Sequence, residues 1–81
     1  MLINVKLFAS YRELVGQEKV GLQCEPGATV GEAMQRLEQT YPVLGRQGYS
    51  PLTACNLRQV GRGHVLQEGD ELAVFPPVSG G

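Results

Sequence analysis

The sequence predicts a two-layer α+β domain, in which one main helix packs across one mixed sheet of four to five strands. Alternating apolar residues open and close the chain, one amphipathic helical pattern lies between them, and turn residues separate the remaining segments. With 81 residues, the chain has the length of one domain with a small core. We expect a folded body over residues 1–75 and a flexible, extended C-terminal tail over residues 76–81.

The first half of the folded body is predicted to begin with two strands. Within residues 2–8, Ile3, Val5 and Leu7 fall on one side and Phe8 falls on the other. Residues 9–15 are typical of a short helical turn that Gly16 closes. Residues 18–24 alternate again, and two strands in succession favour a hairpin.

The main helix is predicted by its capping signal and by its apolar spacing. Thr29 lies three residues before Glu32, which is the spacing of a capping box. The apolar residues behind it share one helical face: Val30, Ala33, Met34, Leu37 and Tyr41. We expect the helix to stop before Pro42, because a residue that precedes proline disfavours helical geometry.

The second half of the body is predicted to contain a loop and further strands. Residues 43–51 indicate a loop, residues 52–57 a strand that Asn56 ends or bends, and residues 64–66 a short strand. Residues 71–75 form the last strand, with Leu72 and Val74 inward and Phe75 outward. The sheet is mixed if the first and last strands pair, which the sequence leaves open.

Charge and composition argue against several classes of function. Seven basic and eight acidic residues give a net charge of −1 without a basic stripe, so neither nucleic acid nor a membrane is the expected partner. The sequence contains no apolar run of membrane-spanning length and no signal-peptide pattern. Cys24 and Cys55 are isolated and are expected to pack as small apolar side chains, which fits a reducing cytoplasm.

Residues of the body supply no set of catalytic or metal-binding groups. His64 is the single histidine and has no cysteine at metal-ligand spacing, so we expect an exposed turn residue and no metal site. In the tail, Ser79 also has no evident histidine–carboxylate partner that would activate it as a nucleophile.

The C-terminal tail is the segment whose residue types best fit a role in a chemical reaction. Pro76 and Pro77 fix φ and favour a stiff, extended exit from the last strand. Gly80 and Gly81 lack side chains, so the tip can enter a narrow channel, and residues 76–81 span on the order of 20 Å when extended. The α-carboxylate of Gly81 is ionised at neutral pH and needs activation before it reacts as an electrophile. The alternative is a frayed chain end, in which glycine is common.

Two aromatic residues near the root of the tail suggest a docking surface. Strand parity places Phe8 and Phe75 on the sheet face away from the helix. Exposed aromatic residues of this kind anchor protein complexes. The alternative is that both are ordinary exposed side chains or make an edge contact.

In these residues the chain resembles the small, sulfur-carrying subunit of molybdopterin synthase, in the ubiquitin-like β-grasp superfamily. The resemblance covers essentially the whole chain and is carried by residues 5–9, 12–14, 29–33, 54–56, Leu66 and 69–81. The closing run from Phe75 to Gly81 is its most specific part. Cys55 stands where this family usually has valine, which argues against a functional cysteine there.

The resemblance implies a β-grasp fold and a carrier that is not an enzyme on its own. An E1-like adenylyltransferase would consume ATP to adenylate the Gly81 carboxylate, and a sulfur donor protein would convert the adenylate into a thiocarboxylate. The tail, with Pro76, Pro77, Val78 and Ser79 as contacts and Gly80 as the slim approach, would enter the large synthase subunit. That subunit would form a heterotetramer with this chain, supply the acid and base groups, and hold the cyclic pyranopterin monophosphate that receives sulfur. No permanently bound cofactor is expected.

Three other functions stay open at this point. A carrier for thiazole synthesis or tRNA thiolation shares the carboxylate chemistry but has a different sulfur acceptor. A ubiquitin-like protein modifier would join Gly81 to a lysine amine. A plain β-grasp binding module would have an inert tail.

Overall fold

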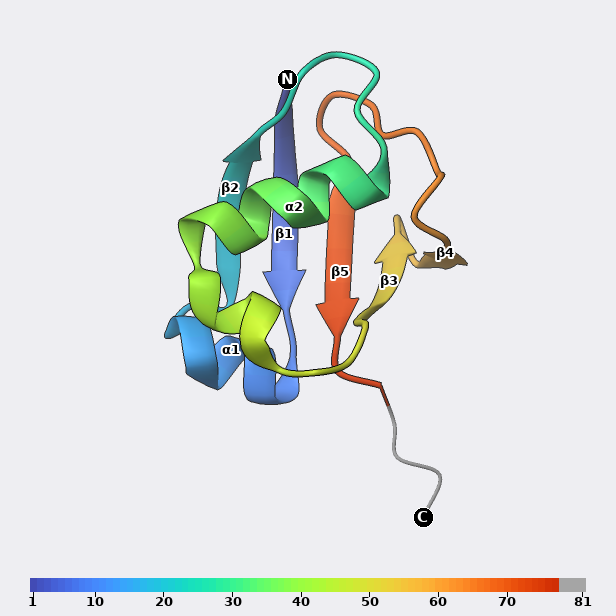
Figure 1. The fold of residues 1–81 in the computed structure, drawn as a ribbon. Coiled ribbons are helices and arrows are strands. Elements are labelled where there is room, and N and C mark those ends of the chain that lie inside the picture. Colours follow the sequence, from blue (N-terminus) through green and yellow to red (C-terminus); the bar gives the residue numbers. More distant parts are fainter. Residues whose placement is uncertain (78–81) are drawn as a thin grey trace.

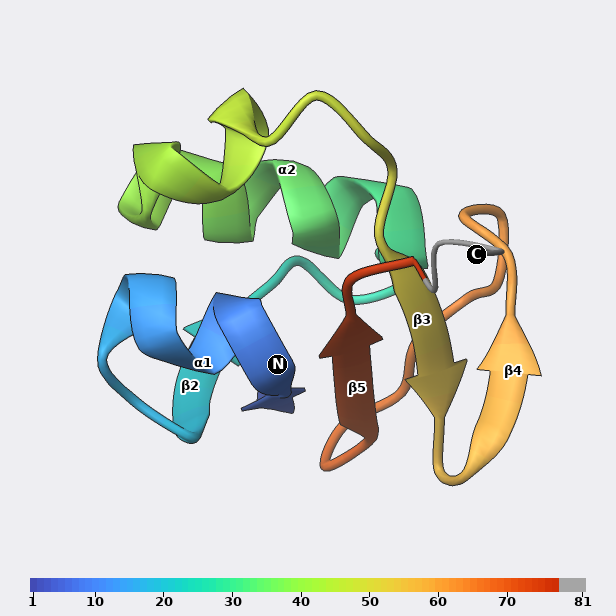
Figure 2. The same ribbon diagram turned by 90° about the horizontal axis from the view of Figure 1, so that it is seen from below.

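The computed structural model describes residues 1–77, and residues 78–81 lie outside the described part. The elements follow one another as β1 (Leu2–Leu7), α1 (Ala9–Val15), β2 (Lys19–Gln23), α2 (Val30–Thr40), η1 (Pro42–Arg46), β3 (Leu52–Cys55), β4 (Arg58–Val60) and β5 (Glu71–Phe75). Five strands form one sheet in the order β2-β1-β5-β3-β4. Figure 1 shows α2 lying across this sheet, and Figure 2 shows that none of the helices within residues 1–77 lies on the opposite face.

The first and last strands lie side by side at the centre of the sheet. β1 pairs with β5 in parallel, with Val5 opposite Leu72 and Leu7 opposite Val74. β2 pairs with β1, and β3 pairs with both β4 and β5, all antiparallel. The predicted mixed sheet is therefore confirmed, and so is the hairpin of the first two strands.

The main helix begins and ends where its sequence signals predict. The Glu32 amide donates to Thr29 Oγ1 at 3.2 Å, and the Thr29 amide donates to Glu32 Oε1 at 3.2 Å. This capping box satisfies two amides that the helix itself leaves unpaired, a contribution of about 1 kcal/mol. α2 ends at Thr40, two residues before Pro42.

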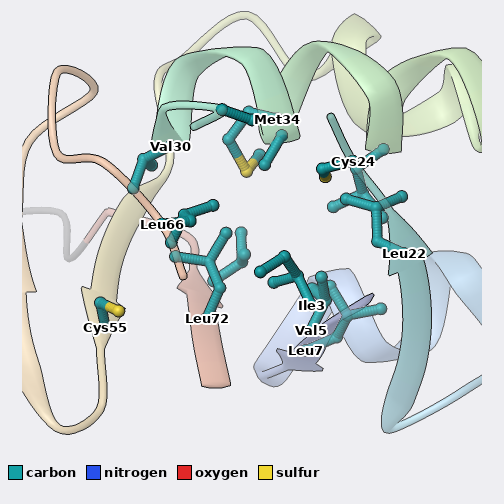
Figure 3. Packing of buried hydrophobic residues seen from close by; sticks show 14 of the residues in the cluster. Ile3, Val5, Leu7, Leu22, Cys24, Val30, Met34, Cys55, Leu66 and Leu72 are labelled. Atoms are coloured by element: carbon teal, nitrogen blue, oxygen red, sulfur yellow. The ribbon is translucent and has the colours of Figure 1, made fainter. Parts of the chain in front are cut away.

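The core lies between α2 and the face of the sheet that α2 covers (Figure 3). Ile3, Val5 and Leu7 of β1 are at most 1% exposed, and Leu72 and Val74 of β5 are equally buried. Four of the five apolar residues predicted for the helix close the core: Val30, Ala33, Met34 and Leu37. The fifth, Tyr41, follows the last residue of the helix and is half-buried against the core. The alternation predicted for both strands is thus confirmed.

Three predicted segments differ from the structure. Residues 42–46 form the short helix η1 where a loop was expected. The predicted strand over residues 52–57 ends at Cys55, because Asn56 and Leu57 adopt φ values of 49° and 72° and turn the chain into β4. Residues 64–66 contribute only one isolated bridge, between Val65 and Thr29, instead of a strand.

The loop after β4 is held on the first turn of α2. The amides of Val30 and Gly31 donate to the carbonyls of His64 and Arg62, both at 2.9 Å, and the Leu66 amide donates to Ala28. A Cβ atom at Gly31 would lie 3.3 Å from the Arg62 carbonyl oxygen and 3.4 Å from its Cβ. The glycine therefore lets the loop backbone approach the helix closely.

Gly31→Val is expected to lower the free energy of unfolding by about 1–3 kcal/mol, because the side chain pushes the loop off the helix. Gly61→Ala is the control, since no atom lies within 4 Å of the position that its methyl group would take. That variant is expected to be neutral or to gain up to about 1 kcal/mol. Urea unfolding measures both, and equal stabilities would refute this account of Gly31.

Candidate functional site

Phe8 and Phe75 are brought together by the parallel pairing of β1 and β5. Phe8 directly follows β1, and Phe75 is the last residue of β5. Their rings stack with centroids 4.6 Å apart and planes inclined by 19°. The Phe8 amide donates to the Val74 carbonyl at 3.2 Å, so the ladder continues to this point. We call these two residues the aromatic pair.

A sharp turn after Phe8 separates the aromatic pair from the next element. Ala9 has a φ of 52°, in the left-handed region that non-glycine residues rarely adopt. The chain therefore leaves the sheet at once and begins α1, while the Phe8 ring stays against Phe75. Both residues are half-buried, and the alternation of β1 and β5 places them on the face opposite α2.

The surface beside the aromatic pair is partly apolar and carries small side chains. Leu52 lies opposite Phe75 in the β3–β5 ladder and is 39% exposed. Ala54 and Ala73 face each other further along the same ladder, and both are half-buried. Sequence reasoning missed Leu52, because its place beside Phe75 follows from a strand register that the sequence does not display.

The tail leaves the sheet next to the aromatic pair. Pro76 follows Phe75 directly and is half-buried, and Pro77 is exposed. The other predicted tail residues, Val78, Ser79, Gly80 and Gly81, lie outside the described residues. The structure therefore shows where the tail begins: at the end of the sheet where β1 and β5 both end (Figure 1).

Both cysteines are buried and belong to the apolar core cluster, as predicted. Burial raises the pKa of the Cys24 thiol. Burial also raises the pKa of Cys55 to about 11, helped by its hydrogen bond to Asp70. Both side chains are therefore thiols at neutral pH, and neither is a ready nucleophile. Within residues 1–77, no cluster of three or more potential metal ligands occurs, and none of the helices is long and apolar enough to cross a membrane.

Asp70 ties the β3–β4 hairpin to the start of β5. Its carboxylate accepts the Gln67 amide at 2.8 Å and the Asn56 side-chain amide at 3.0 Å. Asn56 Oδ1 in turn accepts the amide of Glu71. The hydrogen bonds that the Asp70 carboxylate itself accepts, with the Gln67 amide first, lower the pKa of Asp70. Asp70 therefore has a structural role: it holds Asn56 in the turn that follows β3. This is the turn at which Asn56 was predicted to end the strand.

The arrangement of the sheet, the helix and the tail defines a class of protein. A mixed sheet with one helix across it, parallel central strands and a C-terminal tail that starts from the last strand make a ubiquitin-like β-grasp domain. A family model described as the ThiS family matches residues 5–81, and the chain belongs to this family.

Curated relatives match over nearly the whole chain. Small archaeal modifier protein 3 of Haloferax volcanii is 34% identical, over all of both proteins. Small archaeal modifier protein 1 of the same organism is 38% identical, over 94% of this chain and 97% of that protein. The molybdopterin synthase sulfur carrier subunit of Arabidopsis thaliana is 34% identical, over 98% of this chain and 82% of that protein. The predicted resemblance to sulfur carrier subunits is confirmed.

Solved structures confirm the β-grasp fold. The crystal structure of small archaeal modifier protein 1 from Haloferax volcanii has a TM-score of 0.89 at 32% identity and full coverage of both chains. The solution structure of small archaeal modifier protein 1 from Methanosarcina acetivorans has a TM-score of 0.82 at 28% identity, over 99% of this chain and 96% of that one. A chain in the complex of subunits 1 and 2 of molybdopterin-converting factor from Helicobacter pylori shares the fold, with a TM-score of 0.68 at 21% identity and full coverage of both chains.

The stack of the aromatic pair is expected to contribute to folding beyond the area that each ring buries. In a double-mutant cycle of Phe8→Ala and Phe75→Ala, the two losses in the free energy of unfolding should differ from additivity by about 0.5–1.5 kcal/mol. Phe8→Ala combined with Leu57→Ala is the control, because Leu57 lies in the β3–β4 turn and is 94% exposed. Urea unfolding of the single and double variants tests this, and additive losses in the first cycle would exclude an energetic role for the stack.

Asp70 should make the free energy of unfolding depend on pH in the acid range. Because folding lowers its pKa, the stabilisation is present above the unfolded pKa of about 3.9 and is lost as the pH falls through the lower folded value. Asp70→Asn is expected to lower the free energy of unfolding by about 1–2 kcal/mol at pH 7, and the gap to the parent should close toward pH 2. Urea unfolding at several pH values, with Glu25→Gln as an exposed control, measures the gap; a gap that is constant with pH would contradict the assignment.

Proposed function

We propose that this chain is the sulfur carrier subunit of a molybdopterin synthase, and that Gly81 bears the transferred sulfur. The observation that carries the proposal is the root of the tail. The sequence Pro-Pro-Val-Ser-Gly-Gly follows β5 directly, and its first residue, Pro76, comes straight after the aromatic pair, on a sheet face that none of the helices within residues 1–77 covers. Full-length similarity to sulfur carrier subunits of molybdopterin synthase supports it.

The chemistry of the proposed carrier starts with an unreactive carboxylate. An oxygen of the Gly81 carboxylate would attack the α-phosphorus of ATP on an adenylating enzyme, releasing pyrophosphate and leaving an acyl adenylate. The terminal sulfur of a persulfide on a donor protein would then attack the carbonyl carbon and displace AMP, which leaves an acyl disulfide. A second thiol would attack the donor's sulfur in this disulfide, forming a new disulfide with the donor and releasing the thiocarboxylate. Adenylation is needed because a free carboxylate has no good leaving group. ATP is consumed by the partner, and the expected place of this chemistry is the cytoplasm.

Sulfur transfer would then take place within a complex. The tail would enter the large synthase subunit, and sulfur would pass to cyclic pyranopterin monophosphate, twice for each dithiolene. We expect the large subunit to supply the acid and base groups, because the body of this chain offers no catalytic set among residues 1–77. The fold shared with a chain of the Helicobacter pylori complex of two molybdopterin-converting factor subunits supports a heteromeric assembly, here proposed as a heterotetramer.

The uncovered face is the proposed docking surface for that complex. Phe8, Phe75 and Leu52 form an apolar patch at the root of the tail. The small side chains of Ala54 and Ala73 lie beside this patch and do not project above the sheet. Pro76 and Pro77 would hold the tail in an extended form, with Val78 and Ser79 as further contacts. Alanine at Phe8 or Phe75 is therefore expected to weaken the complex while the domain stays folded.

A second candidate function is conjugation to proteins. Similarity to two small archaeal modifier proteins, at 34% and 38% identity, favours it as strongly as the relatives above favour the carrier. Both functions begin with the same adenylation, and they differ in the nucleophile that displaces AMP: sulfur in a carrier and a lysine amine in a modifier. Carriers for thiazole synthesis or tRNA thiolation share the first of these paths.

Intact mass spectrometry separates these functions. The chain is incubated with the adenylating enzyme and sulfur donor of the same organism and ATP; replacement of one oxygen by sulfur is expected at the C-terminus. Conjugates with other proteins would identify a modifier, and an unchanged mass would mean that the tail is inert.

The terminal glycines should be required for transfer and not for folding. Deletion of Gly81, or Gly80→Leu, is expected to lower sulfur transfer to cyclic pyranopterin monophosphate by about 100-fold or more, since the reacting atom is lost or misplaced. Gly61→Ala is the matched control, because it changes a glycine of the body that has open space around it. Urea unfolding checks that all variants are folded, and full transfer by either tail variant would rule the mechanism out.

A further inference from the structure

Both lysines of the chain lie opposite each other on the uncovered face of the sheet. Lys6 of β1 and Lys19 of β2 are partners in the antiparallel ladder, so their side chains point to the same side. The neighbours Val5 and Leu7 point into the core, which places Lys6 and Lys19 on the face away from α2. The other five basic residues are arginines at other places in the chain.

This arrangement costs stability in the isolated domain. Like charges directly opposite each other across a ladder repel. Among residues 1–77, no acidic side chain forms an ion pair with either ammonium group, although Glu71 of β5 lies on the same face and Glu18 precedes Lys19 in the chain. Within residues 1–77, the pair is thus a concentration of positive charge without an ion-pair partner, on a chain whose net charge is −1.

The lysine pair is continuous with the aromatic pair at the root of the tail. Lys6 Nζ lies 5.4 Å from the centroid of the Phe8 ring, and this ring stacks on Phe75. Lys6 is half-buried and Lys19 is exposed. Positive charge, aromatic surface and tail exit therefore form one patch, which runs from β2 across β1 to the end of β5.

We propose that the lysine pair docks a carboxylate of the protein that takes up the tail. One carboxylate has two oxygens that can accept from two ammonium groups, and opposite side chains in a ladder start only about 5 Å apart. The occupant is a protein surface with at least one acidic side chain at the rim of an apolar cleft. Binding would turn a repulsive pair into a bridged one, and it would speed association by electrostatic attraction.

This proposal rests on the proposed function, because it assumes a protein that takes up the tail. Two cations on a chain of negative net charge favour a discrete carboxylate over an extended polyanion, whose binding depends on neutralising many phosphates. A second copy of this chain is the other possible occupant of the patch, and its binding would appear as self-association.

The decisive variant is Lys19→Glu, tested against Lys6→Arg/Lys19→Arg. Reversing one charge of the pair removes the repulsion, so Tm is expected to rise by about 1–5 °C. The same change should slow association with the tail-accepting partner about 10-fold in 50 mM salt, and the difference should shrink in 1 M salt. The double arginine variant keeps both charges and should associate within about 2-fold of the parent rate.

Arg58→Glu is the matched charge control. It makes the same change in net charge on β4, at the opposite edge of the sheet. The probes are the large molybdopterin synthase subunit and the adenylating enzyme from the same organism, with association followed by stopped-flow fluorescence. Arg58→Glu is expected to leave the association rate within about 2-fold of the parent.

Each remaining outcome decides against the proposal. An unchanged rate for Lys19→Glu in low salt overturns it while the proposed function stands, and so does an equal loss for Arg58→Glu, which would indicate net charge alone. Loss of binding by the double arginine variant would show that lysine geometry, and not charge, matters. Dimers of the parent that Lys19→Glu abolishes would assign the patch to a second copy. Failure of the parent chain to bind either probe would overturn both this proposal and the proposed function.

Discussion

The parallel pairing of β1 with β5 is the constraint on which the rest of the molecule depends. Parallel neighbouring strands end on the same side of the molecule, so the last residue of β5 and the first residue after β1 meet there. An antiparallel pair would have placed Phe8 and Phe75 at opposite ends of the molecule. The stack of these two rings, the turn at Ala9 and the exit of the tail all follow from this single pairing.

The size of the domain explains why one face of the sheet stays available. A chain of this length forms one core, and α2 with the buried residues of the strands closes it on one face only. Positions on the other face do not have to satisfy core packing. Aromatic rings, small alanines and a pair of like charges can therefore gather there, although buried charges would be costly in the interior.

Local signals made part of this structure predictable, and non-local pairing explains the rest. The capping box at Thr29 and the alternation in β1 and β5 are properties of adjacent residues, so α2, the core face and the outward direction of Phe8 and Phe75 could be predicted. The β3–β4 hairpin could not, because Leu57 stands where such a tight turn usually has glycine, and nothing in the structure explains its exposed side chain. The stack of the rings and the facing lysines depend on strand register, which no short stretch of sequence specifies.

Several exceptions to local rules lie near the root of the tail. A left-handed alanine at residue 9, an exposed Leu52 and the two facing lysines all lie on the uncovered face or at the edge where β1 and β5 end. The elements that build the core follow the rules of capping, periodicity and burial closely. Local strain and repulsion persist only where the surrounding structure is stable enough to hold them, and such places are commonly functional. Asn56 and Leu57 are exceptions at the other end of the sheet, where they form the β3–β4 turn. The exceptions at residues 9, 52, 6 and 19 differ from these because they adjoin the root of the tail, on which the proposed function depends.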